Sequence, residues 1–130
     1  MKSKLLLIGS ICSLLGCQQT QPVADPSAAQ QQSAHSAYID LRDGKFDAFM
    51  QHLEPELQTH FQSNEKLMRK FSKAIPEGEY KSHTLMTKQV DEVSKQYKVS
   101  YEYAYPKNLV QYDVSFDQAG GSTKIRNLNI

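Results

Sequence analysis

Four histidines have the clearest potential for metal binding or acid–base chemistry: His35, His52, His60 and His83. A zinc-binding helix typically carries a His-x-x-x-His pair, which places two imidazoles on one helical face. No pair here has that spacing, and His52 and His60 are separated by eight positions across Pro55. We therefore expect no metal site, and we expect these side chains to be exposed or to cap helices.

An acid–base pair is the main catalytic possibility in the sequence. His83 lies in a predicted strand near Glu102 and Asp113, and imidazole and carboxylate groups are common general acids and bases. Both carboxylates, however, alternate with the apolar residues of their strands, so we expect them to face solvent. One hypothesis is therefore a small enzyme whose acid–base site combines His83 with a tyrosine in a pocket.

Other catalytic motifs are missing from the sequence. It contains no Gly-x-Ser-x-Gly nucleophile motif, and Gly120-Gly121 is typical of a hairpin turn and not of a phosphate-binding loop. The only cysteines are Cys12 and Cys17, so thiol chemistry and disulfides are excluded from the rest of the chain. We expect no cofactor.

The chain has seven tyrosines and no tryptophan. Five tyrosines share one face of two predicted neighbouring strands: Tyr97, Tyr101, Tyr103, Tyr105 and Tyr112. In one interpretation they form cross-strand pairs that stabilise a sheet by roughly 0.2–1 kcal/mol each. In the other, they line a partly buried cavity or interface, because a phenol combines an apolar body with a polar tip. These five are the candidate residues for binding a ligand or partner.

The first half of the folded region has helical periodicity. Apolar residues recur at helical spacing in 34–43, with Gly44 as a cap, and again in 46–54 and 65–75. Pro55 interrupts the second stripe, and a further short turn is expected at 57–61.

The second half has strand periodicity. Apolar and polar residues alternate in 97–105 and 110–116, which predicts half-buried antiparallel strands joined by a turn at 106–108. The range 80–90 alternates poorly and is expected to be an edge strand. A last strand at 122–130 would need a β-bulge near Arg126-Asn127 to bury both Ile125 and Leu128. Helices followed by a four-stranded meander predict an α+β fold, with N-terminal helices packed on an antiparallel sheet.

The N-terminus resembles a bacterial lipoprotein signal. Met1-Lys2-Ser3-Lys4 carries two positive charges, and the following apolar run, 5–15, is shorter than the about 20 residues that span a bilayer. Leu14-Leu15-Gly16-Cys17 resembles a lipobox, which implies that Cys17 becomes the acylated first residue of the mature protein. A transmembrane segment and a signal cleaved at another small residue remain the alternatives.

This resemblance also implies a location. In Gram-negative lipoproteins, an aspartate after the cysteine favours retention at the inner membrane, and Gln18 is not an aspartate. The expected location is the cell envelope, at the outer membrane and facing the periplasm if the host is Gram-negative. The acylated Cys17 would then attach the protein to the membrane, its first predicted partner.

Composition divides the chain into three parts. Residues 1–16 form the predicted lipoprotein signal peptide, 17–33 the lipidated cysteine and a flexible tether, and 34–130 a single α+β domain. The alanines in the tether leave open whether the first helix begins earlier. Removing 1–16 changes the net charge from +1 to −1, so nucleic acid is not an expected partner.

Two stretches together resemble the nuclear transport factor 2-like, cystatin-like superfamily, in particular its small secreted bacterial members. They are Tyr38 to Phe49, a helix–glycine–helix pattern, and Val110 to Phe116 followed by Gly120-Gly121 and Lys124 to Leu128. The resemblance implies a curved four-stranded sheet that wraps a helix around a cone-shaped cavity. The segment 53–64 is too short for the inserted hairpin of the larger members, and no catalytic residue of the family's enzymes can be matched here.

These observations favour a membrane-anchored, non-enzymatic binding or accessory domain. Its partner would be a second copy, another envelope protein or a small apolar ligand. The acid–base enzyme with His83 is the alternative, and an accessory subunit of an envelope complex is a third hypothesis.

Overall fold

The computed structural model describes residues 22–130, so the predicted lipidation site at Cys17 lies outside the described residues. Its helices are α2 (Ala28–Arg42), α3 (Phe46–Met50), α4 (Pro55–Gln62) and α5 (Glu65–Ala74). The strands follow as β1 (Ser82–Val90), β2 (Tyr97–Ala104), β3 (Leu109–Phe116) and β4 (Asn127–Asn129). Neighbouring strands are antiparallel and pair in the order β1-β2-β3-β4. The predicted α+β class and the antiparallel meander are confirmed.

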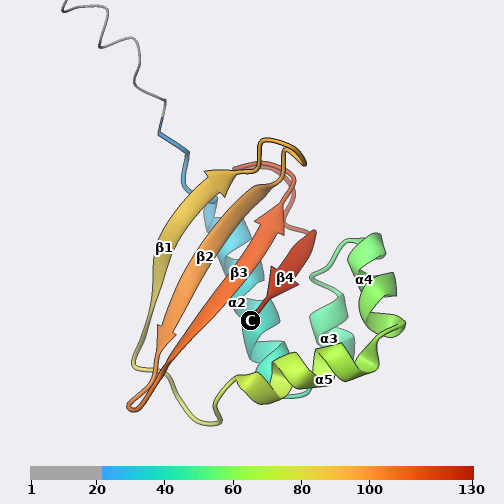
Figure 1. Cartoon of the computed structure of the whole chain (residues 1–130), viewed down its shortest axis with the longest axis vertical. Coiled ribbons are helices and arrows are strands. Elements are labelled where there is room, and N and C mark those ends of the chain that lie inside the picture. The colour runs from blue at the N-terminus through green and yellow to red at the C-terminus, as the bar shows by residue number, and fades with distance from the viewer. Residues whose placement is uncertain (1–21) are drawn as a thin grey trace, which may run out of the picture.

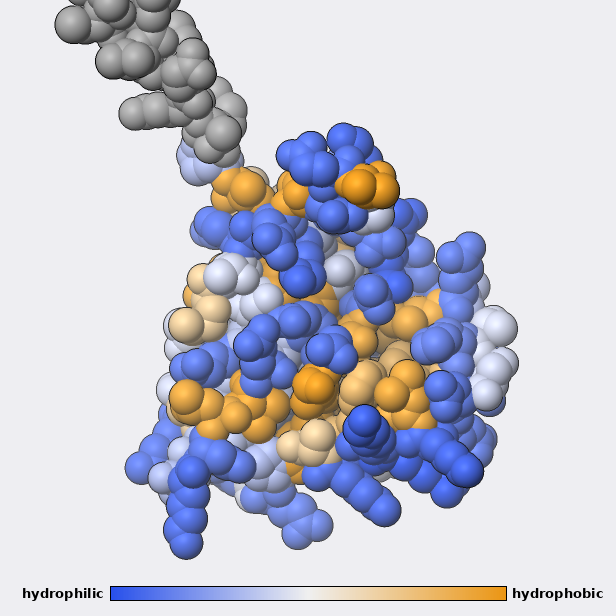
Figure 2. Space-filling view, viewed as in Figure 1, coloured by the Kyte–Doolittle hydropathy of each residue, from blue (hydrophilic) through white to orange (hydrophobic). Residues whose placement is uncertain are grey.

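Two layers make up the described part of the chain. Figure 1 shows α2 lying across one face of the open sheet, while α3, α4 and α5 continue beyond the β4 edge. The opposite face of the sheet is open to solvent, and Figure 2 shows that it is largely hydrophilic. This difference between the two faces follows from the alternation of β2 and β3, whose odd and even positions point to opposite sides.

The packed region begins earlier than the sequence predicts. Residues 28–33 were expected in the flexible tether, but they form the first turns of α2 behind a capping box of Ser27 and Gln30. Gln30 is fully buried. Its Nε2 donates to the carbonyls of Gln118 and Ser122, at 2.8 and 3.0 Å, and its Oε1 accepts from the Gly120 amide at 3.0 Å. These bonds satisfy a buried amide, which is why a glutamine-rich stretch belongs to the fold.

The core between α2 and the sheet is built from the residues that the periodicity singled out. Ala34, Ala37, Tyr38 and Leu41 are 0–1% exposed on the inner side of α2. They face the inward residues of β2 and β3, where Tyr101 is directly opposite Tyr112. Gly44 ends the helix as predicted, with a φ of 72° that suits glycine.

A second apolar cluster joins the three short helices. Its rings are those of Phe49, Phe61 and Phe71, with centroids 5.5 and 6.2 Å apart in edge-on contact. The expected turn at 57–61 is part of the eight-residue helix α4, which has Pro55 in its first turn.

The C-terminal strand is shorter than predicted. β4 contains only three residues, and the expected bulge near Arg126-Asn127 is not the reason that both Ile125 and Leu128 are buried. Instead, Ile125 precedes the strand and forms an isolated parallel bridge with Leu53. The chain therefore reaches from the α3–α4 junction to the sheet before β4 starts, and it connects the two apolar clusters.

Candidate functional site

The five candidate tyrosines all lie in the core. Their exposed fractions run from 0% for Tyr112 to 7% for Tyr105. A partly open phenol face is one of the two interpretations of the sequence, but α2 covers this face of the sheet (Figure 1). The phenols are therefore packed as cross-strand and helix–sheet contacts, and a ligand would have to displace α2 to reach them.

Most of the phenol hydroxyls bind groups on α2 or on the segment that precedes it. Tyr112 donates to the carbonyl of Ala34 at 2.8 Å, and the hydroxyls of Tyr38 and Tyr105 are 2.6 Å apart. Tyr101 is the exception: among residues 22–130, its hydroxyl is the one buried side-chain polar atom without a hydrogen bond. The tips of the tyrosines thus fix the position of the helix on the sheet.

Burial keeps three of these phenols, those of Tyr101, Tyr103 and Tyr112, protonated. It raises the pKa of Tyr101 to about 12 and raises the pKa values of Tyr103 and Tyr112 well above the usual 10. At physiological pH they can donate or accept hydrogen bonds, but they cannot act as phenolate bases.

An imidazole–phenol cluster lies where α2 meets the start of β1; we define it as His35, Tyr80, His83 and Tyr103. The Nδ1 of His35 is 2.9 Å from the Tyr103 hydroxyl, and its Nε2 is 3.1 Å from the Tyr80 hydroxyl. The ring of His83 stacks on that of His35, with centroids 4.9 Å apart. Both nitrogens of His35 are therefore occupied by phenols, which leaves neither free for a metal ion.

This environment favours the neutral form of His35. Burial lowers the pKa of His35 below 6.5, and repulsion from His83 and Arg42 lowers it further. A neutral imidazole donates from one nitrogen and accepts at the other, which matches a position between two hydroxyls.

The structure brings His83 next to Tyr80 and Tyr103 but not next to either carboxylate. His83 is exposed and lies against rings, on the inward-facing side of β1 opposite Tyr103. Glu102 and Asp113 are partly exposed, and they belong to the outward-facing set of the sheet, as their alternation indicates. The sheet thus separates His83 from both carboxylates.

The remaining histidines are scattered. His52 pairs with Asp40 at 2.9 Å and links the turn after α3 to α2, whereas His60 is exposed beside Phe61. Among residues 22–130, no group of three or more metal-ligating side chains could hold an ion together.

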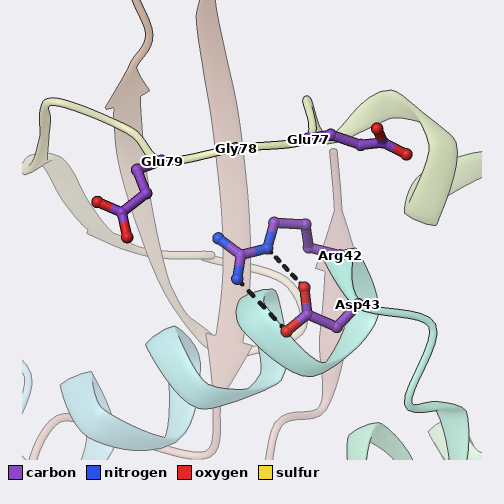
Figure 3. Close-up of a pocket in the computed structure, with 5 residues that line it drawn as sticks. All are labelled: Arg42, Asp43, Glu77, Gly78 and Glu79. Carbon is purple, nitrogen blue, oxygen red and sulfur yellow. Dashed lines mark hydrogen bonds and ion pairs between the residues drawn. The ribbon is translucent and has the colours of Figure 1, made fainter.

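An open cleft of about 420 Å³ lies beside the imidazole–phenol cluster. It is lined by Arg42, Asp43, Glu77, Gly78 and Glu79. Figure 3 shows the Arg42 guanidinium turned to Asp43, with N–O distances of 2.8 and 3.3 Å, and the Glu77 carboxylate pointing away. The cleft is polar and open, and its guanidinium is paired with the Asp43 carboxylate.

Strand β1 is the longer of the two edge strands of the sheet. It pairs with β2 on one side only, as predicted for an edge, and no other described strand covers its free side. Most of its nine residues are exposed, including Met86 (53%) and Val90 (49%). The strand contains one basic residue, Lys88, and no acidic residue. Free main-chain groups on such a strand can pair with an extended segment of another chain.

Sequence reasoning did not find the imidazole–phenol cluster as a unit. His35 and Tyr38 follow one another at helical spacing within the apolar stripe of α2, which is a usable signal for a half-buried histidine. Tyr80, in contrast, belongs to an irregular segment, and its contact with His35 spans 45 positions of sequence.

Comparison of the chain with models of known protein families, with curated proteins and with solved structures found no match. Within the part of the chain that the structure describes, no helix is both long and apolar enough to span a bilayer.

Proposed function

We propose that the protein is a lipid-anchored envelope protein whose folded part is a non-enzymatic docking domain. In this proposal, an extended segment of another envelope protein pairs with the free edge of β1. The observation that carries it is the long, uncovered and nearly uncharged edge of this strand. The anchor is supported by Leu14-Leu15-Gly16-Cys17, and the order of helices and strands supports a nuclear transport factor 2-like, cystatin-like fold.

The chemistry of β1 suits an extended protein segment better than a small ligand. The free main-chain groups of β1, on either side of a register shift between Leu85 and Thr87, would provide a binding surface that tolerates different partner sequences. The exposed side chains of Met86 and Val90 add apolar contacts near its middle and end. The core phenols, by comparison, are covered by α2 and offer no such surface.

Site-specific photo-crosslinking in the native host tests this proposal. A photoreactive amino acid at Met86 should give a crosslinked product of defined mass. The same group at Leu109, which is 62% exposed and lies on β3, two strands away from β1, should not. A product of twice the mass of this chain would show a second copy in place of another protein and would overturn the choice of partner. Equal crosslinking at both positions, or none, would overturn docking at β1.

The anchor is tested separately by mass spectrometry of the N-terminal peptide. We expect a mature protein that begins at Cys17 and carries acyl chains, and we expect the Cys17→Ser variant to lose them. An unmodified mature chain would overturn the anchor while leaving the docking strand to be judged by the crosslinking.

A further inference from the structure

The chain enters the fold at one end of the long axis of the molecule (Figure 1). Two contacts hold this entry segment against the sheet. The Tyr97 hydroxyl donates to the carbonyl of Ala24 at 2.6 Å, and Lys88 Nζ lies 2.6 Å from Asp25 Oδ1. The point from which the preceding residues leave the fold is therefore fixed beside the ends of β1 and β2.

The same end carries the β1–β2 turn, which comprises Asp91–Gln96. The turn is braced internally: the Asp91 amide donates to the Gln96 carbonyl at 2.9 Å, and the Asp91 carboxylate accepts from the Ser94 amide at 2.7 Å. At its tip, Val93 is 91% exposed, more than any other large hydrophobic residue among those described. A rigid turn thus holds an apolar side chain in solvent.

Val93 does not stand alone at this end. Val90 is 49% exposed and opens the turn, and Val23 in the entry segment is partly buried against the core. Figure 2 shows hydrophobic surface where the described chain begins and on the turn beside it. The apolar residues are therefore grouped around the point at which the chain leaves the fold.

The length of chain between the predicted anchor and the fold is short. Five peptide steps separate Cys17 from Pro22. Each step spans at most about 3.6 Å, so their Cα atoms lie no more than about 18 Å apart. The far end of the sheet is separated from the entry end by the eight residues of β2, which span about 26 Å. A lipid on Cys17 would consequently keep the entry end, and not the far end, next to the bilayer.

From these observations we propose that the entry end of the domain rests on the lipid surface, with Val93 inserted at the headgroup boundary. This inference rests on the proposed acylation of Cys17, because the tether supplies the high local concentration that a single valine needs. The arrangement directs α5 away from the bilayer, since α5 lies at the opposite end of the molecule (Figure 1). The exposed basic residues of α5, Lys66, Arg69, Lys70 and Lys73, would then face other envelope components and not the lipids of the anchoring membrane.

Tryptophan fluorescence of the mature, acylated protein tests this orientation, because the natural chain contains no tryptophan. Val93→Trp and the matched control Leu109→Trp each introduce one indole at an exposed site. Both proteins are reconstituted into vesicles of phosphatidylethanolamine and phosphatidylglycerol that contain brominated acyl chains. We expect blue-shifted, strongly quenched emission for Val93→Trp only, and unshifted, unquenched emission for Leu109→Trp.

Flotation of the vesicles separates the two proposals. If both variants float but their indoles are equally quenched, or neither is, the proposed orientation is overturned and the anchor stands. If neither variant floats and Cys17 carries no acyl chain, the anchor fails, and the orientation fails with it.

Discussion

The interface between α2 and the sheet differs in kind from the cluster formed by the short helices. The first contains tyrosines and a histidine whose polar atoms are almost all hydrogen-bonded, whereas the second is built around the rings of Phe49, Phe61 and Phe71. Hydrogen bonds require particular distances and angles, while dispersion and hydrophobic contacts do not. The position of α2 is thus set by directional bonds, and the short helices are held mainly by burial of apolar surface.

The largest expected effect concerns the phenylalanine cluster. Phe61→Ala removes a ring that is 1% exposed and leaves a cavity between Phe49 and Phe71, so we expect a loss of about 3–5 kcal/mol in the free energy of unfolding. Urea unfolding followed by circular dichroism measures it. A loss below about 1 kcal/mol would show that this region can collapse around the missing ring.

The next largest effect concerns the buried amide that ties α2 to the β3–β4 loop. Gln30→Ala removes its bonds to Gln118, Gly120 and Ser122, and it leaves their main-chain groups unpaired. We expect a loss of about 2–4 kcal/mol. The same unfolding measurement applies, with the exposed neighbour Gln31→Ala as the control. Equal stability of the two variants would contradict the anchoring role of Gln30.

A smaller effect separates two phenols of the same interface. Tyr112→Phe removes the hydrogen bond to the Ala34 carbonyl and should cost about 1 kcal/mol. Tyr101→Phe removes a buried hydroxyl without a partner, so its stability should be unchanged or slightly higher. Equal losses in the two variants would mean that the Tyr101 hydroxyl is also paired in solution.

The smallest effect is a pH dependence from His35, because its ring is only half-buried. Its folded pKa lies below the unfolded value of 6.5, so the unfolded chain binds more protons at mildly acidic pH. The free energy of unfolding should therefore fall as the pH drops below about 6.5. At higher pH, His35 should make no pH-dependent contribution to it. Unfolding of the protein and of His35→Gln at a series of pH values isolates this contribution. Identical pH profiles would exclude it.

The strands and their faces were predictable because apolar and polar residues alternate along β2 and, from Val110 onward, along β3. The inward position of Tyr97, Tyr103 and Val114 follows from this alternation alone. The helix periodicity located the inner face of α2 for a similar reason. Both signals are local, and they hold because one side of each element is buried and the other is not.

The parts that escaped prediction depend on contacts between distant segments. The local sequence around Gln30 is typical of a tether, because its hydrogen-bond partner Gly120 is 90 positions away. The local sequence around Ile125 is typical of a strand, but this residue forms an isolated bridge with the distant Leu53. The pairing of His35 with Tyr80 and Tyr103 has the same origin, which is why the sequence indicated His83 as a catalytic candidate and not His35 as a structural link.

The clamp formed by Tyr97 on Ala24 and by Lys88 on Asp25 has a mechanical consequence. In the proposed arrangement, a bilayer on the N-terminal side and a protein bound along β1 could pull the domain in opposite directions. The force would act on this clamp and on the adjacent strand β1. In this arrangement the load would bypass the short helices, so the protein would resist pulling through two polar contacts and one pair of strands.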